Sequence, residues 1–348
     1  MRVTALAGGT GAAKLIRGLV AVLPPSDLTV VVNTGDDARI WGLHVSPDLD
    51  SVTYALASRL DVARGWGLRD ETFNCLDAMA TLGAETWFNL GDRDLATHLF
   101  RTERLSAGEP LSAVTAELAR RQSVATRILP MSDDPVRTKI LTPDLAGAGD
   151  LAGAANGWLD FQEYFVREKA CVAVVDVAYA GAADARPAPG VLDAIAGADL
   201  VVVCPSNPVT SIGPILAVPG IVAALGDTRA PVIGVSPIVG DAPVSGPAGA
   251  LMRARGLPIS PLGVVQAYRD WLDALVLDTR DATLAPAVQD LGVVPVVADI
   301  IMTDHAHEVA LARVILETAA SVRTAGAGGP ADGWARPGRD RSPRRHIQ

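Results

Sequence analysis

Glycines and a lysine follow the first apolar run of the chain. Gly8-Gly9-Thr10-Gly11 comes directly after residues 3–7, and Lys14 lies on the first turn of a stretch with helical composition. Glycines let a backbone approach a ligand closely, and a helix N-terminus points free N–H groups at an anion. The P-loop pattern is absent, and Lys14 stands where the third glycine of a dinucleotide fingerprint belongs. We expect Gly8, Gly9, Thr10, Gly11 and Lys14 to bind phosphate, unless the glycines only form the turn.

Carboxylates follow the second apolar run, residues 28–32. Asp36 and Asp37 end the sequence Asn-Thr-Gly-Asp-Asp, and Asp48 and Asp50 lie in the nearby Ser-Pro-Asp-Leu-Asp. Magnesium usually takes one or two protein carboxylates, and substrate phosphates and waters complete its shell. We therefore predict that Asp36 and Asp50 bind Mg²⁺ beside the glycine loop. For Asp48, ordinary complementarity to a helix N-terminus is an open alternative.

A third polar segment spans residues 87–101. If Asp94 begins a helix, then Asp94, His98 and Arg101 are spaced to share one face. That face can bind a polar ligand and offer His98 as a base, or it can be a surface stripe of ion pairs.

Two later loops also carry polar groups. Asp133 lies in Leu-Pro-Met-Ser-Asp-Asp-Pro, where a carboxylate can accept hydrogen bonds from a base or a sugar. Ser206, Asn207 and Ser211 follow the apolar run 199–203, and short hydroxyl and amide side chains after a strand suit an anion or a sugar. A plain turn is the alternative for each loop.

The elements that must position these residues alternate along the chain. Residues 3–7 and 28–32 read as strands with a helix between them, which is a βαβ unit and implies a parallel sheet. Further strands are expected at 171–175, 199–203, 231–235, 274–277 and 293–297. Residues 70 to about 127 read as a helical insertion. The prediction is one α/β domain over 1–324, with a Rossmann-like, mostly parallel sheet flanked by helices, and a disordered basic tail over 325–348.

Composition restricts the function classes. The net charge of -9 argues against a nucleic-acid partner, and no apolar run is long enough to span a membrane. Three scattered cysteines and an N-terminus without a signal sequence favour a cytoplasmic protein. The chain has neither a G-x-S-x-G elbow nor a metal-type Cys/His cluster, so phosphoryl-type transfer fits the residues better than acyl hydrolysis or zinc catalysis.

Taken together, the segments resemble the 2-phospho-L-lactate transferase family of coenzyme F420 biosynthesis, whose actinobacterial members are called phosphoenolpyruvate transferases. The resemblance runs from Gly8 to about Ala312 and is carried by the ordered set GGTGAAKL, VVNTGDD, SPDLDSVTYAL, GWGLRDET, WFNLGDRDLATHLFRT, LPMSDDPVRT, FQEYFV, PSNPVTSIGPIL and VSPIVGDAPVSGPAG.

The resemblance implies an activity. A guanosine-diphosphate-activated three-carbon acid, carrying lactate or enolpyruvate, is attacked by the terminal hydroxyl of a deazaflavin alcohol, and GMP leaves. It also implies a requirement for Mg²⁺ and a homodimer. On this basis we expect the glycine loop, Lys14, Ser206, Asn207 and Ser211 to hold the nucleotide. Asp50 and Arg93 are candidates for the deazaflavin side, and Asp48 or His98 for the base.

Two other functions stay open. A related family of gluconeogenesis-factor regulators shares the Gly-Gly-Thr-Gly start and binds nucleotide-sugars without evident catalysis. A nicotinamide oxidoreductase is the other alternative, although the incomplete glycine fingerprint is against it. The sequence does not distinguish lactate from enolpyruvate, and it does not indicate which residue reads the guanine.

Overall fold

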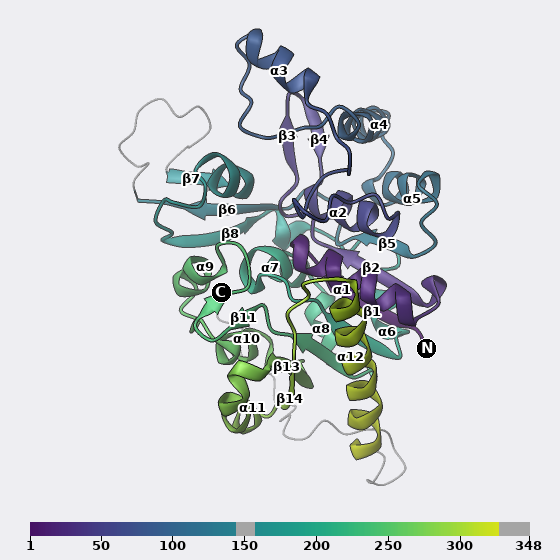
Figure 1. Ribbon diagram of the computed structural model, residues 1–348, viewed down its shortest axis with the longest axis vertical. Helices are drawn as coiled ribbons and strands as arrows, with labels where there is room; N and C mark the ends of the chain where they lie inside the picture. The colour runs from purple at the N-terminus through teal and green to yellow at the C-terminus, as the bar shows by residue number, and fades with distance from the viewer. Residues whose placement is uncertain (144–156, 327–348) are drawn as a thin grey trace.

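The β-branched and aliphatic runs of the chain form a seven-stranded parallel sheet. We describe it from a computed structural model that covers residues 1–143 and 157–326 (Figure 1). The strand order is β14-β13-β10-β9-β1-β2-β5, and all six pairings are parallel. The strands are β1 (Val3–Ala7), β2 (Leu28–Val32), β5 (Arg127–Pro130), β9 (Leu200–Val203), β10 (Val232–Val235), β13 (Ala274–Asp278) and β14 (Val294–Ala298).

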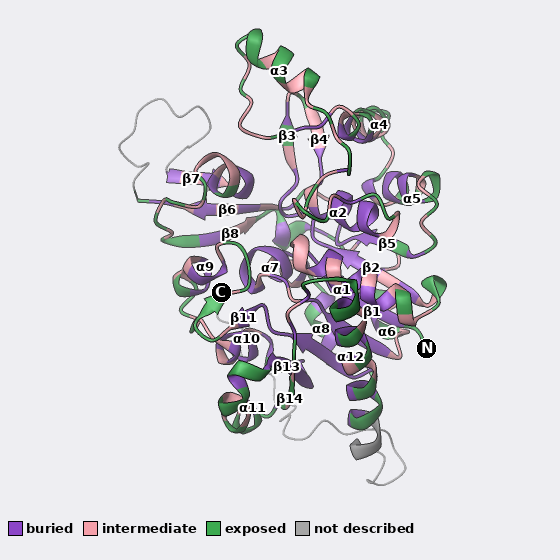
Figure 2. Ribbon diagram, viewed as in Figure 1, coloured by how far each residue is buried: buried purple, intermediate pink, exposed green. Residues whose placement is uncertain are grey.

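Except at the edge strand β14, both faces of this sheet are buried, as Figure 2 shows for its central strands. Side chains of a strand alternate between faces, so each of the other strands contributes to two cores. In β1, Leu6 belongs to one core, whereas Val3, Ala5 and Ala7 belong to the other. A strand buried on both sides has no polar face, which is why these segments read as continuous apolar runs.

Helices cover the two faces. One core includes residues of α1 (Gly9–Val22), α2 (Pro47–Leu56), α5 (Leu111–Arg121) and α12 (His305–Gly326). The other core includes residues of α6 (Val191–Ala196), α7 (Gly213–Ala217), α8 (Ile221–Asp227), α9 (Ala248–Ala254), α10 (Pro261–Tyr268) and α11 (Ala285–Asp290).

The chain order places a switch point beside β1. From β1 the chain runs to β2 and β5 on one side, and later to β9, β10, β13 and β14 on the other. Neighbouring loops after β1 and β9 therefore diverge to opposite sides of the sheet. In open α/β sheets, ligands bind at such a point, outside the carboxyl ends of the strands.

Smaller elements surround the sheet. A three-stranded antiparallel sheet consists of β6 (Arg137–Leu141), β7 (Trp158–Asp160) and β8 (Asp176–Ala180). Two hairpins are formed by β3 (Ala38–Ile40) with β4 (Leu43–Val45), and by β11 (Ile238–Val239) with β12 (Ala242–Pro243). The remaining helices are α3 (Asn74–Thr81) and α4 (Asp94–Ser106), and single turns include η3 (Glu163–Arg167) and η5 (Pro208–Ile212).

The predicted fold class and most predicted elements are confirmed. The helical insertion over 70–127 contains α3, α4 and α5. The strand predicted at 171–175 is wrong, because those residues form no strand and the pairing begins at Asp176 in the antiparallel sheet. The predicted tail lies outside the described residues from 327 onwards, and 325–326 end α12.

Within the described part of the chain, no single helix is long and apolar enough to cross a membrane. One pair, Pro208–Ala217 with Ile221–Asp227, passes by length and composition together, but it is bent by 89°.

Candidate functional site

The loops after β1, β2 and β9 meet at the carboxyl edge of the sheet, as the parallel pairing requires. Ser206 joins the first to the last: its hydroxyl donates to the Gly8 carbonyl at 2.7 Å and accepts the Gly8 N–H at 3.4 Å. The glycines are needed for this approach. A Cβ on Gly8 would lie 2.7 Å from Ser211 Cβ, and one on Gly11 would lie 2.5 Å from the Pro205 carbonyl oxygen.

Asp48 extends from the first turn of α2 to the N-terminus of α1. Its carboxylate accepts the Gly9 N–H at 2.7 Å and the Asn33 side-chain amide at 2.9 Å. Asn33 is in turn oriented by the Gly35 N–H, which donates to its oxygen at 2.8 Å. A carboxylate at this place shows that the start of α1 attracts negative charge, which is the property a phosphate would use.

Three carboxylates near the start of α1 are buried and influence one another electrostatically. Asp36, Asp37 and Asp48 are all buried, and burial followed by the charge of Asp48 raises the pKa of Asp36 well above its ordinary value. Burial likewise raises the pKa of Asp48 to about 6, although its two hydrogen bonds oppose the change. One oxygen each of Asp36 and Asp37 has no hydrogen-bond partner among the described residues.

Such a cluster fits a divalent cation. A metal would remove the repulsion between Asp36 and Asp48 and would accept the free oxygen of Asp36 as a ligand. The described residues contain no group of three or more His, Cys, Asp or Glu side chains that could hold a metal.

Asp50 has a different environment from Asp36. Both of its carboxylate oxygens are bound by Arg101, with Nη1 at 3.0 Å from Oδ2 and Nη2 on Oδ1. His98 lies beside this pair, with Nδ1 at 3.7 Å from Asp50 Oδ2 and Nε2 at 3.2 Å from Asp94 Oδ2. The geometry therefore makes Asp48 a better second carboxylate for a cation than Asp50, whose charge Arg101 already balances.

The predicted face of α4 exists, but it turns inward. Asp94 begins the helix, and Asp94, His98 and Arg101 are 9%, 1% and 2% exposed, so the alternative of a surface stripe is wrong. Tyr54 of α2 donates to Asp94 Oδ1 at 2.5 Å. The face thus binds α2 to α4 and positions Asp50, and it leaves His98 enclosed between two carboxylates.

Other predicted residues have local partners. Lys14 Nζ donates to the Met302 carbonyl at 3.1 Å, and Arg93 is exposed at the start of α4 with Nη1 3.4 Å from the Arg69 carbonyl. Asp133 accepts both the backbone N–H and the hydroxyl of Ser112, at 2.6 and 2.8 Å. It therefore stabilises the first turn of α5, a role that a purely functional interpretation of this residue missed.

Asn207 also has a structural role. Its side-chain oxygen accepts the Val209 N–H at 2.9 Å and so caps η5. This turn carries Ser211, which is buried next to Gly8.

Sequence reasoning missed two polar partners. Asn33 orients Asp48, and His44 lies with Nε2 2.8 Å from Asp37 Oδ2, which also accepts the Ser46 hydroxyl at 2.8 Å. Ser46 directly precedes α2, but its side chain binds Asp37 instead of capping the helix. Asn33 lies in the same sequence motif as Asp36 and could have been included with it. The contact between His44 and Asp37 could not be inferred from the sequence, because it depends on the β3–β4 hairpin.

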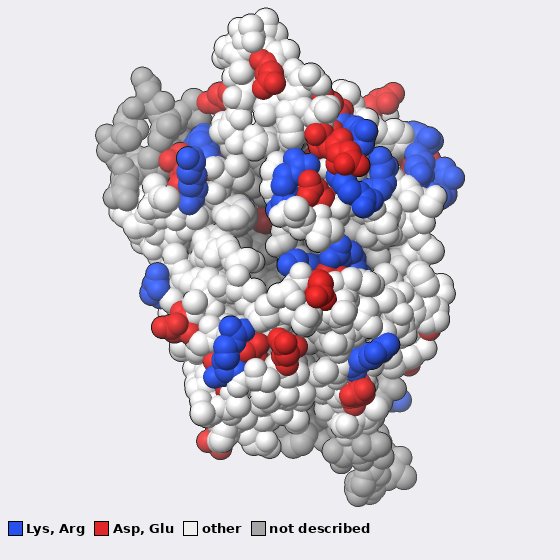
Figure 3. All heavy atoms as spheres, in the orientation of Figure 1, with Lys and Arg blue, Asp and Glu red and all other residues white. Residues whose placement is uncertain are grey.

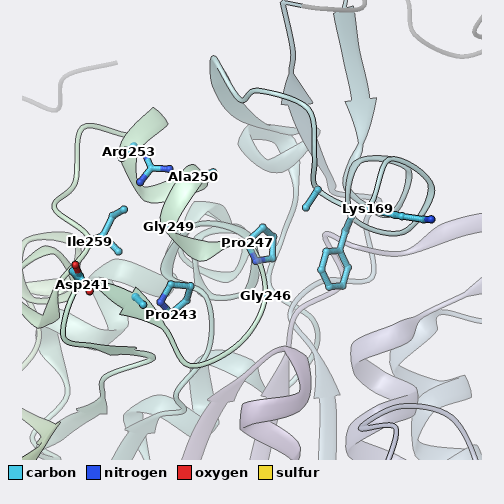
Figure 4. Close-up of a pocket in the computed structure, with 12 residues that line it drawn as sticks. Lys169, Asp241, Pro243, Gly246, Pro247, Gly249, Ala250, Arg253 and Ile259 are labelled. Atoms are coloured by element: carbon cyan, nitrogen blue, oxygen red, sulfur yellow. The ribbon is translucent and has the colours of Figure 1, made fainter. Parts of the chain in front are cut away.

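Two hollows are visible on the molecule. Figure 3 shows one near the centre of the viewed face, over the region where α1, α2 and α7 meet in Figure 1. A second cavity of about 480 Å³ lies between η3, the β11–β12 hairpin and α9 (Figure 4). The second cavity is lined by none of the predicted site residues, so the convergence of loops, and not cavity size, identifies the candidate site.

Comparisons with known proteins agree with this geometry. The model of the 2-phospho-L-lactate transferase CofD family matches residues 3–316. A phosphoenolpyruvate transferase of Streptomyces griseus is 45% identical over 93% of this chain and 100% of its own length. A 2-phospho-L-lactate transferase of Methanosarcina mazei is 40% identical over 89% of this chain and 98% of its own.

The fold also matches a solved structure. A UPF0052-family protein of Bacillus halodurans has a TM-score of 0.61 and 18% identity, over 90% of this chain and 98% of that one. At this identity the likeness concerns the fold alone. The family model and the two transferases together cover nearly the whole described chain, and the chain belongs to the 2-phospho-L-lactate transferase CofD family.

Proposed function

We propose that the protein transfers a phospholactyl or phosphoenolpyruvyl group from its guanosine-diphosphate-activated form to 7,8-didemethyl-8-hydroxy-5-deazariboflavin. The terminal hydroxyl oxygen of this deazaflavin attacks the distal phosphorus, and the bond from that phosphorus to the bridging oxygen breaks. The products are a phosphodiester, GMP and the hydroxyl proton, and the reaction belongs to coenzyme F420 biosynthesis. The names of the relatives support the reaction class.

The observation that carries the proposal is the buried Asp36–Asp48 pair beside the start of α1. The Asp48 carboxylate already accepts the Gly9 N–H at the Gly8–Gly11 loop. A phosphate bound at this loop would lie close to that carboxylate, and the repulsion between the two negative groups requires a cation. We propose Mg²⁺ as that cation, held by Asp36 with Asp48 beside it. When bound, it neutralises phosphate charge and polarises the phosphorus–oxygen bonds.

The nucleotide side of the site is proposed to lie between the β1–α1 loop and the β9–η5 loop. Gly8, Gly9 and Gly11 give backbone access to the phosphates, and Ser206 holds the two loops together. The Ser211 hydroxyl also lies beside this loop, 3.8 Å from the position that a Cβ on Gly9 would take. Lys14, on the second turn of α1, would have to leave the Met302 carbonyl to reach a phosphate, which its flexible side chain can do.

For the hydroxyl proton, the structure favours Asp48 over His98. Asp48 is at the phosphate loop, where it accepts the Gly9 N–H. His98 is only 1% exposed and lies between Asp50 and Asp94, so it supports α2 from behind. Asp50 and Arg93 remain candidates for the deazaflavin side, and we expect the enzyme to act as a cytoplasmic homodimer.

The test is to mix the protein, the deazaflavin alcohol, the activated acid and Mg²⁺, and to follow GMP release. Mass spectrometry of the product from the two activated acids in competition identifies the three-carbon group. Asp36→Asn and Asp50→Asn are compared at rising Mg²⁺. We expect Asp36→Asn to need more Mg²⁺, and an unchanged requirement in that variant would refute the metal assignment. Nucleotide binding without GMP release would instead support the regulator.

A further inference from the structure

The motif GWGLRDET has no role in the function proposed above, although it lies next to the site. It spans residues 65–72, and its first five residues lie in the segment 61–69, which we call the Trp66 loop. A Cβ placed on Gly65 would lie 3.6 Å from Thr10 Cγ2, so this loop touches the phosphate-binding segment. Trp66 follows Gly65 and is 38% exposed.

The Trp66 loop is held together by backbone hydrogen bonds of its own. The Asp61 N–H donates to the Gly67 carbonyl at 3.0 Å, and the Gly65 N–H donates to the Asp61 carbonyl at 2.8 Å. Leu60 and Leu68 form a bridge at its base. Both leucines are buried in one cluster with Ala13 of α1 and with Tyr54 and Ala55 of α2. The loop is thus anchored to the two helices whose first turns form the candidate site.

The indole ring has a defined partner on one side. The Arg64 guanidinium lies 5.1 Å from the Trp66 ring centroid and 5.5 Å from that of Phe73. Arg64 is itself fixed, because its Nε is 2.7 Å from Asp61 Oδ2 and its Nη2 donates to the Leu68 carbonyl at 2.9 Å. A partly exposed aromatic ring held by a fixed cation is a platform on which a flat ligand can stack.

The position of the platform favours the acceptor over the nucleotide. The β9–η5 loop with Ser206 is on the β9 side of β1, whereas the Trp66 loop follows α2, which comes after β2 on the other side. The exposed Arg93, a candidate for the acceptor side, donates to the Arg69 carbonyl at the end of the Trp66 loop. The two sides of the crevice therefore carry separate sets of groups.

We infer that Trp66 stacks on the tricyclic ring of the deazaflavin acceptor and that Arg64 fixes the orientation of the indole. This inference rests on the proposed function, because it assigns a substrate to one side of the same site. Arg64 acts through Trp66 and is a positioning residue.

The test is steady-state GMP release with Trp66→Ala, Trp66→Phe and the control Trp87→Phe. Trp87 is half-buried and contacts Arg167 and Phe88, away from the Trp66 loop. Stacking of a base on an aromatic side chain corresponds to an effect on the order of tenfold. Trp66→Ala should raise the KM for the acceptor by about tenfold and leave the KM for the activated acid unchanged. Trp66→Phe keeps a ring and should restore most of the affinity.

A binding measurement supplements the kinetics and does not need turnover. The acceptor alone should quench part of the tryptophan emission of the wild type, and the same part should persist in Trp87→Phe but vanish in Trp66→Phe. GDP alone should bind the wild type and the Trp66 variants equally. Thermal melting of each variant verifies folding, and Trp66→Phe with its quenching result decides the question if Trp66→Ala is unfolded.

Three results would overturn the inference. They are an acceptor KM that does not change in the Trp66 variants, a loss of GDP affinity in place of acceptor affinity, and quenching that persists in Trp66→Phe. Failure of the proposed function gives a different result, because the wild type would then neither release GMP nor show quenching by the acceptor.

Discussion

Replacing Arg101 tests whether its buried ion pair with Asp50 stabilises the contact between α4 and α2. Its guanidinium is 2% exposed and binds both oxygens of Asp50 across 51 positions of sequence. Arg101→Met keeps the length and the helix preference of the side chain but leaves a buried carboxylate without its partner. Removing one member of a buried pair costs about 3–5 kcal/mol. For a chain of 348 residues this corresponds to a fall in melting temperature of about 4–7 °C.

The same helix provides a matched control. Arg104 pairs with Glu109 at 2.6 Å, but both side chains are 38% exposed, and exposed pairs contribute about 0–1 kcal/mol. Arg104→Met should therefore shift the melting temperature by about 1 °C or less. The double variant Arg101→Met with Asp50→Asn should recover on the order of 2 kcal/mol, because the stranded charge is gone.

The assay is thermal unfolding by circular dichroism together with denaturant titration of the wild type and the three variants at neutral pH. The reasoning is refuted if Arg101→Met costs no more than Arg104→Met, or if Asp50→Asn recovers nothing. Either result would mean that the buried pair does not stabilise the contact between α2 and α4.

Three further predictions concern other parts of the site and its surroundings. Gly8→Ala should cost about 1–3 kcal/mol and abolish GMP release, because the new Cβ would lie 2.7 Å from Ser211 Cβ; unfolding and activity assays check both. EDTA should stop GMP release, and added Mg²⁺ should restore it. Asp36→Asn should raise the Mg²⁺ concentration that is needed to restore GMP release, and an unchanged concentration would mean that Asp36 does not bind the cation. The Thr72 hydroxyl and backbone N–H groups at the start of α3 lower the pKa of Asp92, so its contribution is complete above about pH 4 and is lost as the pH falls through the lower folded value. Hydrogen exchange of α3 should therefore be faster in Asp92→Asn than in the wild type at pH 7, and equal protection of the two proteins would contradict this capping role.

The central strands could be predicted because a strand that is buried on both faces appears in the sequence as a continuous apolar run. The bounds expected for residues 3–7 and 28–32 are those of β1 and β2. The segment 171–175 misled for a related reason: it is apolar, but strand pairing with β6 begins only at Asp176. The edge strand β5 went unnoticed because Arg127–Pro130 is short and continues directly into the polar loop with Asp133.

The site was predicted in its parts but not in its pairing. The sequence singled out Gly8, Asp48 and Ser206 in three separate segments, which the structure brings together. It could not show that Asp50 is bound by Arg101 or that Asp133 stabilises α5, because both contacts join distant segments. Carboxylates that look alike in the sequence thus have different roles in the structure. Asp48 lies beside the phosphate loop, Asp50 forms a buried ion pair with Arg101, and Asp133 binds the start of α5.

The most direct measurement of the central claim is GMP release by the purified wild-type protein with the deazaflavin alcohol, each activated acid and Mg²⁺. The account predicts GMP and a phosphodiester product in equal amounts, and neither product when Mg²⁺ or the deazaflavin is omitted. Nucleotide binding with no GMP under the complete conditions would contradict it.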